Sequence, residues 1–515
     1  MNEQEAPTPD LGDLPEAEFR RLLHEVADWI ADYRSGIETR RVVPAHSPGA
    51  TMSELSAAPP QTAESMDEIL RDFDRVIMPG IVHWGHPSFL GYFATTTTAP
   101  GIIGEMLAAA LNVSAMTWQT SPAATELETI VLDWLRQMLG LPSEFQGVVY
   151  DTASVAVLHA LAAAREELGF DVRGAGLAGR ADLPALTLYA SDQAHSSLEK
   201  AAITLGVGEA NVRRIACDDE YRMDVAALRR ALDEDSQAGR RPLAVVATVG
   251  TTSATSVDPV AEIAGVCRER RIWLHVDAAY GGAMALLEEG RHLMRGVELA
   301  DSVVFNPHKW LFVPLDFSAL YVRRPESLRR VFSLVPEYLR GDAERAGETM
   351  HNYMDYGLQL GRRFRALKAW FVIRAFGRAG LAARIREACR LACVVAGWVE
   401  ADDRFELLAP VVMGVVCFRA RPVGAVGSKE DAGGGAREEA TNEFNERLLE
   451  RVNATGATYL THTRLRGRLA LRIAVGNVLT NESHLARAWE LVCQHHAGLL
   501  EVPRTPARAG TREGA

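Results

Sequence analysis

One lysine of this 515-residue chain stands where a reactive amine would be useful. The apolar run 302–305 (SVVF) is typical of a buried strand, and Lys309 follows it closely in the tetrapeptide Asn-Pro-His-Lys. The chain has four lysines against 51 arginines, so arginine normally fills its cationic positions. A lysine amine can lose its proton and condense with a carbonyl, which a guanidinium cannot do. Lys309 is therefore a candidate for Schiff-base chemistry, the alternative being a strand-end lysine that reaches solvent.

An aspartate ends a second apolar run. Residues 272–276 (IWLHV) lead into Asp277, where an isolated carboxylate is costly to bury without a partner. A protonated pyridine nitrogen is one such partner, and the pair keeps the ring cationic so that it absorbs carbanion density. A salt bridge or a helix cap is the alternative role. Lys309 and Asp277 together are the two parts that pyridoxal 5′-phosphate (PLP) requires.

Small and hydroxyl residues follow a third predicted strand, 147–150. Thr152, Ala153 and Ser154 come next and open a predicted helix. The free N–H groups and the dipole at a helix N-terminus suit a phosphate. An ordinary helix cap is the structural alternative.

Two more predicted strands end near polar residues. His195 follows 186–190 and could stack on an aromatic ring, although a surface histidine would have the same sequence. Thr248, within 243–249, could orient a neighbouring carboxylate, although a strand threonine is usually structural. Each of these five strand ends has an ordinary structural explanation, but the occurrence of all five in one chain is much less expected by chance than any single one.

The elements that must position these residues alternate from about residue 100 as strand, loop and helix. This order predicts a largely parallel sheet with helices on both faces, in which a ligand lies beyond the carboxyl ends of the strands. The helices expected between the strands are 155–168, 197–205, 225–235 and 259–270.

The rest of the chain divides by composition and periodicity. Helices are expected from residue 16, around 66–76, over 363–376 and from 381 to 399, then near 441–453 and 482–495; strands are expected near 411–418 and 468–475, and a flexible loop over 423–437. The predicted segments are a disordered start (1–15), an N-terminal helical segment packing on the partner subunit (16–99), a large PLP-binding α/β domain (100–380), a small C-terminal α+β domain (381–501) and a disordered tail (502–515).

The composition narrows the class of protein. The net charge of −12 argues against nucleic acid or an anionic membrane as the main partner. The acidic N-terminus does not resemble a signal peptide, and no apolar run approaches the roughly 18 residues of a membrane span. Six scattered cysteines indicate reduced thiols in a cytoplasmic protein. Cys389 and Cys393, four residues apart on a predicted helix, indicate core packing, and no metal site is expected.

Several long motifs occur in an order that identifies a family. They are HPSFLGYF (86–93), TSPAATELE (120–128), SDQAHSSLEKA (191–201), HVDAAYGG (275–282), FNPHKWLFVPLDFSA (305–319), LGRRFRALKAWFVIRAFG (360–377) and LRIAVGN with HLARAWELV near the C-terminus. Over residues 16–497 the chain resembles the PLP-dependent group II amino-acid decarboxylases, most closely the aromatic-L-amino-acid decarboxylase branch. The resemblance implies a fold type I (aspartate-aminotransferase-like) enzyme that works as a homodimer with sites at the subunit interface.

The resemblance also assigns roles around the PLP ring. Lys309 would form the Schiff base, with Asp277 on the pyridine nitrogen. His195 would stack over the ring and Ala279 would pack on its other face. Thr248 would support the aspartate.

Further roles concern the phosphate. The residues implied near it are Thr152, Ala153, Ser154 and Asn306. His308 would lie beside the Schiff-base lysine. The family usually has an acidic residue after the phosphate-loop serine, whereas this chain has Val155, a departure that concerns local detail of the phosphate loop.

The substrate pocket is implied at four residues, Tyr92, Thr95, Met116 and Trp118. Thr95 would lie near the substrate carboxylate. The aromatic branch tends to carry Phe where this chain has Met116, and because methionine is unbranched and adaptable the pocket could favour a different side chain. Of all the properties that the resemblance implies, the identity of the substrate is the one that these residues define least.

The implied reaction removes carbon dioxide from an L-amino acid, an aromatic one (tryptophan, phenylalanine, tyrosine or dihydroxyphenylalanine) being expected, and leaves the amine. Residues 340–359 read as a mobile lid, and Tyr353 within them is expected to donate the proton to Cα. An aldehyde synthase, or a decarboxylase of a non-aromatic amino acid, is one alternative. A catalytically silent homologue that serves as a binding protein is another, disfavoured by the joint presence of Lys309, Asp277, His195 and Tyr353.

Overall fold

The computed structural model describes residues 12–93, 95–334, 352–421 and 434–501. The chain forms two compact units, Met1–His86 and Pro87–Ala515, and each is described by itself. The expectations for residues 1–11, for most of the lid, for the loop up to residue 433 and for the tail lie outside the described residues. No helix in the described ranges is both long and apolar enough to cross a membrane.

The regular secondary structure described in the first unit is helical. α1 (Glu16–Ser35) and α3 (Met66–Asp72), which continues as the π-helical turn Phe73–Ile77, confirm the helices predicted there. α3 begins with a capping box in which the side chains of Ser65 and Glu68 each bond the other's backbone N–H. α2 (Ala50–Glu54) is a short helix between them.

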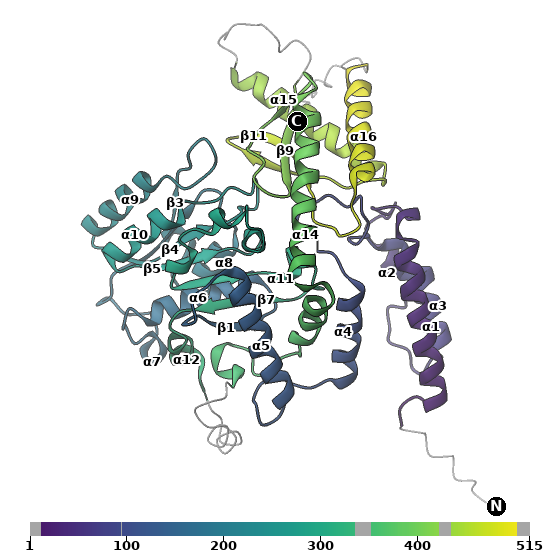
Figure 1. Ribbon diagram of the computed structural model, residues 1–515, viewed down its shortest axis with the longest axis horizontal. Helices are drawn as coiled ribbons and strands as arrows, with labels where there is room; N and C mark the ends of the chain where they lie inside the picture. Colours follow the sequence, from purple (N-terminus) through teal and green to yellow (C-terminus); the bar gives the residue numbers. More distant parts are fainter. Residues whose placement is uncertain (1–11, 94, 335–351, 422–433, 502–515) are drawn as a thin grey trace, which may run out of the picture. The chain divides into compact units, whose positions relative to one another are not determined.

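A seven-stranded sheet forms the centre of the second unit (Figure 1). Its order is β1-β7-β6-β5-β4-β2-β3, and β7 alone is antiparallel to its neighbours β1 and β6. The strands are β1 (Gln146–Tyr150), β2 (Leu186–Ser191), β3 (Val212–Ile215), β4 (Arg241–Thr248), β5 (Trp273–Asp277), β6 (Ser302–Phe305) and β7 (Ser318–Val322). The predicted α/β fold with a mostly parallel sheet is confirmed. β3 and β7 were not expected from the sequence.

Helices cover both faces of this sheet (Figure 1). On one face α6 (Ala153–Glu166) contacts the central strands and packs against α8 (Ser197–Thr204) and α12 (Glu326–Phe332). On the other face lie α5 (Pro122–Leu139), α9 (Val225–Gln237) and α10 (Val260–Arg270). Strands buried on both faces read as continuous apolar runs, which is why the sequence revealed most of them.

A long helical segment, α14 (Ala366–Glu400), leads from the sheet towards the C-terminal region. Gly377 interrupts it with φ 60° and ψ 168°, a backbone conformation open to glycine. The two helices predicted on either side of this point are therefore confirmed. α4 (Ala99–Leu111) packs along α14.

The C-terminal region contains a four-stranded antiparallel sheet, ordered β10-β11-β9-β8. Its elements are β8 (Phe405–Leu407), β9 (Val415–Ala420), α15 (Gly434–Ala454), β10 (Thr461–Leu465), β11 (Arg468–Ala474) and α16 (Glu482–Leu500). Residues 434–437, expected in a flexible loop, begin α15 instead, because the alanine- and glutamate-rich sequence after them extends the helix towards its N-terminus.

Residues 87–99 belong to the second unit and not to the helical N-terminus. Phe89 forms a parallel bridge with Tyr459, and the N–H of Leu90 donates to the Tyr459 carbonyl at 2.9 Å. These contacts attach the segment that carries Tyr92 and Thr95 to the C-terminal region.

Candidate active site

The carboxyl ends of β4, β5 and β6 lie side by side. Thr248 at the end of β4 is in register with Asp277 at the end of β5, and Asp277 is in register with Val304 of β6. The N–H of Asn306 donates to the carbonyl of Ala279 at 3.1 Å. The alternation of strands and helices thus brings together residues that lie tens of positions apart in the sequence.

Lys309 lies on α11 (Pro307–Trp310), a single helical turn that follows β6. Burial lowers the pKa of its amine, the charge of Asp277 opposes this, and the charge of Arg472 adds to it. The amine Nζ lies 5.1 Å from the centre of the Phe93 ring. A lysine in this setting reaches its neutral, nucleophilic form more readily than one in water.

Asp277 and His195 lie within electrostatic range of each other. Desolvation lowers the pKa of His195. The charge of Asp277 opposes this effect, and the charge of Lys309 adds to it. The His195 Nδ1 accepts a hydrogen bond from the N–H of Ser197 at 3.1 Å, so the neutral ring carries its proton on Nε2. One carboxylate oxygen of Asp277 accepts from the N–H of Ala279 at 3.0 Å, which leaves the other oxygen available to a ligand.

Thr248 is fixed through its backbone. Its N–H donates to the carboxylate of Asp258 at 2.8 Å, and its carbonyl accepts from the N–H of Asp258 at 2.9 Å. Its hydroxyl is buried and has no hydrogen-bond partner among the described residues. Buried hydroxyl groups normally have a hydrogen-bond partner, so this one, next to Asp277, is available to a polar ligand.

The N-terminus of α6 follows β1 as predicted. Thr152 takes the N-cap position with extended backbone, and its side chain makes no capping hydrogen bond. Ala153 and Ser154 form the first turn, whose N–H groups have no partner inside the helix. Val155 is partly buried and packs against the core.

Asn306 and His308 form a small polar network. The Asn306 Oδ1 accepts from the hydroxyl of Ser318 at 2.7 Å, and its Nδ2 lies 3.3 Å from the His308 Nε2. The His308 Nδ1 accepts from the N–H of Phe317 at 3.0 Å. Burial, and then the nearby Lys309, lower the pKa of His308 to about 3. The network thus places a neutral imidazole one residue before the reactive amine.

Arg472, in β11, is a site residue that the sequence analysis missed. It is 4% exposed, and its Nη2 has no hydrogen-bond partner among the described residues. Its Nε donates to the Ser253 carbonyl at 3.1 Å and its Nη1 to the Tyr92 carbonyl at 2.5 Å. An arginine in the middle of the otherwise apolar run LALRIA (469–474) was the available signal, because buried cations need a partner.

Phe93 joins Arg472 to Lys309. The Arg472 guanidinium lies 4.8 Å from the centre of the Phe93 ring, the same ring that Lys309 approaches. Phe93 stacks on Tyr280 at 3.9 Å, and Tyr280 stacks on Trp310 at 4.4 Å. Two cations thus face one aromatic ring, which stabilises both and leaves a concentration of positive charge for an anionic ligand.

Tyr92 and Thr95 lie on either side of Phe93 in sequence. Tyr92 has a positive φ of 53°, and its phenol lies 3.2 Å from the phenol of Tyr459. Thr95 is half-buried. Tyr92 is therefore tied to the Lys309 region through the hydrogen bond that its carbonyl accepts from Arg472.

Tyr353 belongs to a different cluster. It is buried at the start of the helical turn Tyr353–Tyr356, and its phenol lies 2.9 Å from the hydroxyl of Thr129 on α5. The Arg362 guanidinium lies 4.8 Å from the centre of its ring. Burial raises the pKa of the Tyr353 phenol, and the charge of Glu128 adds to the effect. These contacts of Tyr353 involve elements other than those that carry Lys309 and Asp277.

Met116 and Trp118 lie with Tyr353 and not with Lys309. The N–H of Met354 donates to the Met116 carbonyl at 3.1 Å, and the N–H of Trp118 donates to the side chain of Asn352 at 3.1 Å. The expected site residues therefore fall into two groups within one chain. The first surrounds Lys309, and the second surrounds Tyr353.

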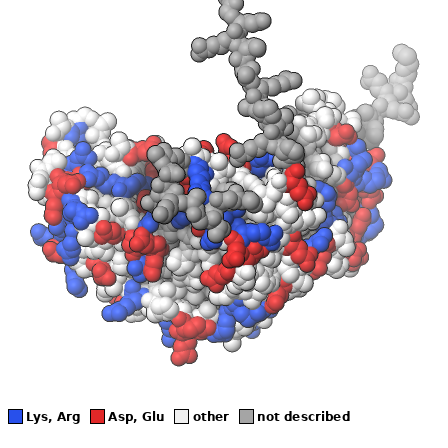
Figure 2. Space-filling view, turned by 90° about the horizontal axis from the view of Figure 1, so that it is seen from above, with Lys and Arg blue, Asp and Glu red and all other residues white. Residues whose placement is uncertain are grey.

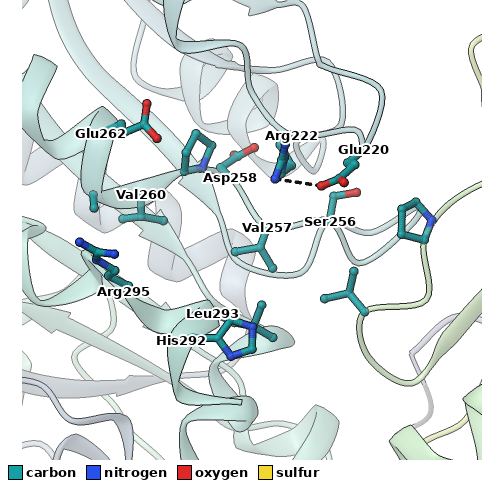
Figure 3. A pocket seen from close by; sticks show the side chains of 14 residues that line it. Glu220, Arg222, Ser256, Val257, Asp258, Val260, Glu262, His292, Leu293 and Arg295 are labelled. Atoms are coloured by element: carbon teal, nitrogen blue, oxygen red, sulfur yellow. Dashed lines mark ion pairs between the residues drawn. The ribbon is translucent and has the colours of Figure 1, made fainter. Parts of the chain in front are cut away.

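A separate hollow of about 590 Å³ lies near Asp258 (Figure 3). It contains none of the predicted site residues. Arg222, which points into it, is paired with Glu220 at 2.8 Å. This hollow has no lysine among the described residues that line it, so it offers no Schiff-base chemistry.

The residues around Lys309 fit PLP. A neutralisable amine can take its aldehyde, and an available carboxylate oxygen of Asp277 can take its ring nitrogen. The first turn of α6 offers N–H groups to its phosphate. The unpartnered hydroxyl of Thr248 is a further polar group within this end of the sheet.

Comparisons with known proteins identify the family to which this chain belongs. The model of the pyridoxal-dependent decarboxylase conserved domain matches residues 48–421. Aromatic-L-amino-acid decarboxylase of Sus scrofa is 41% identical over 494 residues, which cover 94% of this chain and 97% of the relative.

Solved structures agree with this match. The crystal structure of Oryza sativa TDC with PLP and tryptamine has a TM-score of 0.89 at 40% identity and covers 95% of this chain and 100% of that one. Rhodiola rosea 4-hydroxyphenylacetaldehyde synthase has a TM-score of 0.84 at 35% identity, over 95% and 100% of the two chains. The chain therefore belongs to the pyridoxal-dependent decarboxylases, and it is a PLP-dependent carboxy-lyase of fold type I.

Proposed function

We propose that this enzyme removes the carboxyl group of an aromatic L-amino acid and releases the corresponding amine. The observation that carries the proposal is the pairing of Lys309 with a buried, incompletely bonded Arg472 across Phe93. An amine for the cofactor and a cation for a carboxylate are thus placed within one aromatic-lined site. The relatives whose names mention aromatic amino acids, or whose structures contain tryptamine, support an aromatic side chain.

When bound, PLP supplies an aldehyde for amine condensation and a ring that takes up the electron pair left by carbon dioxide. Lys309 holds the cofactor through its amine, and Asp277 keeps the pyridine nitrogen protonated. His195 and Ala279 pack on the two faces of the ring. Thr152, Ala153, Ser154 and Asn306 hold the phosphate, while His308 stays neutral beside the lysine; Thr248 supports the aspartate.

Arg472 orients the substrate carboxylate. Its Nη2 is buried without a partner among the described residues, so a carboxylate would supply the missing acceptor. Its other nitrogens are fixed by two backbone carbonyls, which hold the guanidinium plane. A carboxylate so anchored, with Thr95 as a further polar neighbour, would be held in a fixed orientation relative to the cofactor, whose ring would take up the electron pair left by carbon dioxide.

We further propose that the second group of residues completes the site of a second copy of this chain. α4 supports this arrangement, because it leaves an apolar face exposed. Its exposed side chains are Ile103 (50%), Met106 (38%), Leu107 (45%) and Leu111 (58%). Exposed apolar residues at this spacing mark a contact surface. In such a homodimer Met116 and Trp118 line the pocket for the substrate side chain of the partner.

The N-terminal unit supplies a second apolar surface. Phe19 and Leu23 of α1 and Ile69 of α3 are exposed. They support the packing of this helical segment on the partner subunit. A large PLP-binding region over 100–380 and a small one over 381–501 complete the proposed division of each chain.

A proton donor for Cα must reach the reacting carbon. The buried position of Tyr353 and its bond to Thr129 favour a structural role for this phenol. Tyr338 is the one tyrosine between residues 335 and 351, outside the described residues, and it is the second candidate. The phenol that donates the proton is the one whose change to Phe diverts product from amine to aldehyde.

The second candidate function is an aldehyde synthase, favoured by the similarity to the Rhodiola rosea protein. Both reactions release carbon dioxide, so they differ only after that step. Protonation at Cα gives an amine, whereas reaction with oxygen gives an aldehyde, ammonia and peroxide. Measuring amine and peroxide together separates them.

The proposal is tested with the PLP-loaded enzyme and single amino acids. Carbon dioxide, amine, aldehyde and peroxide are measured for tryptophan, phenylalanine, tyrosine and dihydroxyphenylalanine, with glutamate and cysteine sulfinate as non-aromatic controls. We expect amine and carbon dioxide in equal amounts from an aromatic substrate. Aldehyde and peroxide as the main products would establish the synthase, and turnover of the acidic amino acids alone would overturn the aromatic assignment.

The surface and the thiols indicate the kind of partner and the location. Positive and negative side chains are intermixed on the face that Figure 2 displays, and the net charge is −12. These features support a small-molecule partner over nucleic acid or an anionic membrane. All six cysteines are unpaired, which supports a cytoplasmic location.

A further inference from the structure

The loop that carries Met116 and Trp118 is held from one side by Asn352 and Met354. The Asn352 Oδ1 accepts the hydrogen bond from the Trp118 N–H at 3.1 Å, and the Met354 N–H donates to the Met116 carbonyl at 3.1 Å. Asn352 is 8% exposed, so its bond to the loop is largely shielded from water. These two hydrogen bonds hold the loop backbone on this side, and the Ser121 N–H also donates to the carbonyls of Thr117 and Trp118 at 3.2 Å.

Arg362 holds the beginning of the same loop. The N–H of Ala115 donates to the Arg362 carbonyl at 2.8 Å, and the Arg362 Nη1 donates back to the Ala115 carbonyl at 2.9 Å. The guanidinium is also paired with the buried Glu128 at 2.5 Å. The start of the loop is thus fixed by a charged side chain, whereas the N–H of Trp118 is bonded to the neutral side chain of Asn352.

The side chains of Met116 and Trp118 take a smaller part in this attachment than that of Thr117, which is buried between them with its hydroxyl 2.8 Å from the Thr120 hydroxyl. Met116 and Trp118 are both half-buried. The indole N–H of Trp118 donates to Glu126 at 2.8 Å, close to the loop itself. The loop therefore has a fixed backbone, and Met116 and Trp118 remain partly accessible, as residues of a pocket wall would.

We propose that Asn352 is a positioning residue that sets the substrate side-chain preference of this enzyme. The proposal rests on the proposed function, in which Met116 and Trp118 line the substrate pocket. Without the Asn352 oxygen, the Trp118 N–H loses its acceptor, and the loop backbone shifts as it finds another. A displaced wall changes the fit of a bulky indole and of a smaller phenyl ring by different amounts. Lys309 lies on other elements, so cofactor binding stays the same.

The test compares Asn352→Ala with Asn352→Asp, which keeps an acceptor oxygen for the Trp118 N–H. We expect Asn352→Ala to change the ratio of kcat/KM for tryptophan over phenylalanine by about tenfold, the scale of a modest change in an apolar pocket. Asn352→Asp should keep the ratio within about twofold. Asn453→Ala is the matched control, because Asn453 also accepts from a backbone N–H, that of Leu460 at 2.9 Å, in the C-terminal region.

Hydrogen exchange supplies a readout that does not depend on activity. In Asn352→Ala the Trp118 amide should lose protection, while the Ala115 amide, bonded to Arg362, keeps it. If this variant fails to fold, Asn352→Gln replaces it: the added methylene moves the acceptor oxygen away from the Trp118 N–H, so the protection of this amide should fall and the substrate ratio should change, as for Asn352→Ala.

Each outcome decides one point. If the Trp118 amide of Asn352→Ala loses protection but the tryptophan-to-phenylalanine ratio of kcat/KM is unchanged, the role in specificity is wrong. It is also wrong if Asn352→Asp or Asn453→Ala changes that ratio as much as Asn352→Ala does. Retained protection of the Trp118 amide overturns the hydrogen bond itself. A wild-type enzyme that decarboxylates none of the aromatic amino acids overturns the proposed function instead, and the exchange measurement still tests the Asn352 contact.

Discussion

At the scale of single residues, the chemistry of this enzyme depends on opposed charges around one amine. Burial and Arg472 lower the pKa of Lys309, while Asp277 raises it. The amine is therefore easier to deprotonate than a lysine in water, and the aspartate limits how far this goes. A reactive lysine needs both neighbours, because condensation requires the neutral amine and the ring requires a negative partner.

Lys309→Ala should abolish turnover while the protein still folds, because the residue contributes an amine and little packing at the end of β6. Borohydride treatment of the PLP-loaded wild type, followed by peptide mass mapping, should place the pyridoxyl group on Lys309. Recovery of the label on Lys200, Lys368 or Lys429 would contradict this assignment.

Arg472→Met should shift the pH dependence of cofactor capture. Arg472 lowers the pKa of Lys309, so its removal raises that pKa, and the neutral amine then appears only at higher pH. The binding of pyridoxal to the apoenzyme can be followed by absorbance at a series of pH values. In the variant the midpoint of this pH dependence should move to higher pH, and the KM for substrate should rise. Arg466→Met, which removes an exposed arginine paired with Asp219, is the control and should move neither quantity.

At the scale of elements, close helix packing supports the site. α4 and α14 approach so closely that a Cβ on Gly104 would lie 2.7 Å from the Cα of Lys368. α4 also approaches the segment that continues from α11, since a Cβ on Gly101 would meet Pro314 at 2.4 Å. Glycine at these two positions is therefore a requirement of packing and not of backbone conformation.

Gly104→Ala should lower the midpoint of thermal unfolding, because the methyl group meets backbone and forces the helices apart, at a cost of about 1–3 kcal/mol. Gly265→Ala, in the interior of α10, is the matched variant, since a Cβ there meets nothing within 4 Å. It should stabilise the protein by about 0.5–1 kcal/mol through helix propensity. Equal shifts in the two variants, measured by differential scanning fluorimetry, would rule out the packing argument.

At the scale of the whole molecule, the two groups of site residues lead to the proposal that each active site is completed by a second chain. Lys309, Asp277 and Arg472 form one group, while Met116 and Tyr353 belong to the other. If the second group completes a neighbour's site, neither chain of a dimer is active alone. Sedimentation of the holoenzyme should then give twice the 56.2 kDa mass of the chain.

Hybrid dimers test this division directly. A Lys309→Ala chain lacks the amine, and a Trp118→Ala chain lacks part of the proposed pocket wall. Coexpression of the two should restore part of the activity, because each hybrid contains one site in which both groups are intact. A mixture no more active than its separate components would show that both groups serve the same chain. Mixed chains of Lys309→Ala with Asp277→Asn, which disable the same group, are the control and should stay inactive.

The sequence by itself determined the fold class and most of the Lys309 group. Buried parallel strands read as apolar runs, and the residues that follow them meet at one edge of the sheet whatever the loops between them do. β3 (VRRI) was missed because two arginines interrupt its apolar pattern. β7 is as long as β1 and β5 and fully buried, so neither its length nor its burial explains why it was missed. The helix N-terminus of α6 and the two-part helix around Gly377 followed from local pattern, whereas the register of Thr248 with Asp277 came from the structure.

Only the tertiary structure decided which side chains share a site. Arg472 and Phe93 lie 379 positions apart, and nothing local predicts that one guanidinium and one amine face the same ring. Likewise, Tyr353 read as a lid residue from its neighbours, yet it is buried against Thr129. Contacts between distant residues depend on how whole elements pack, which is a property of the complete chain and not of any segment of it.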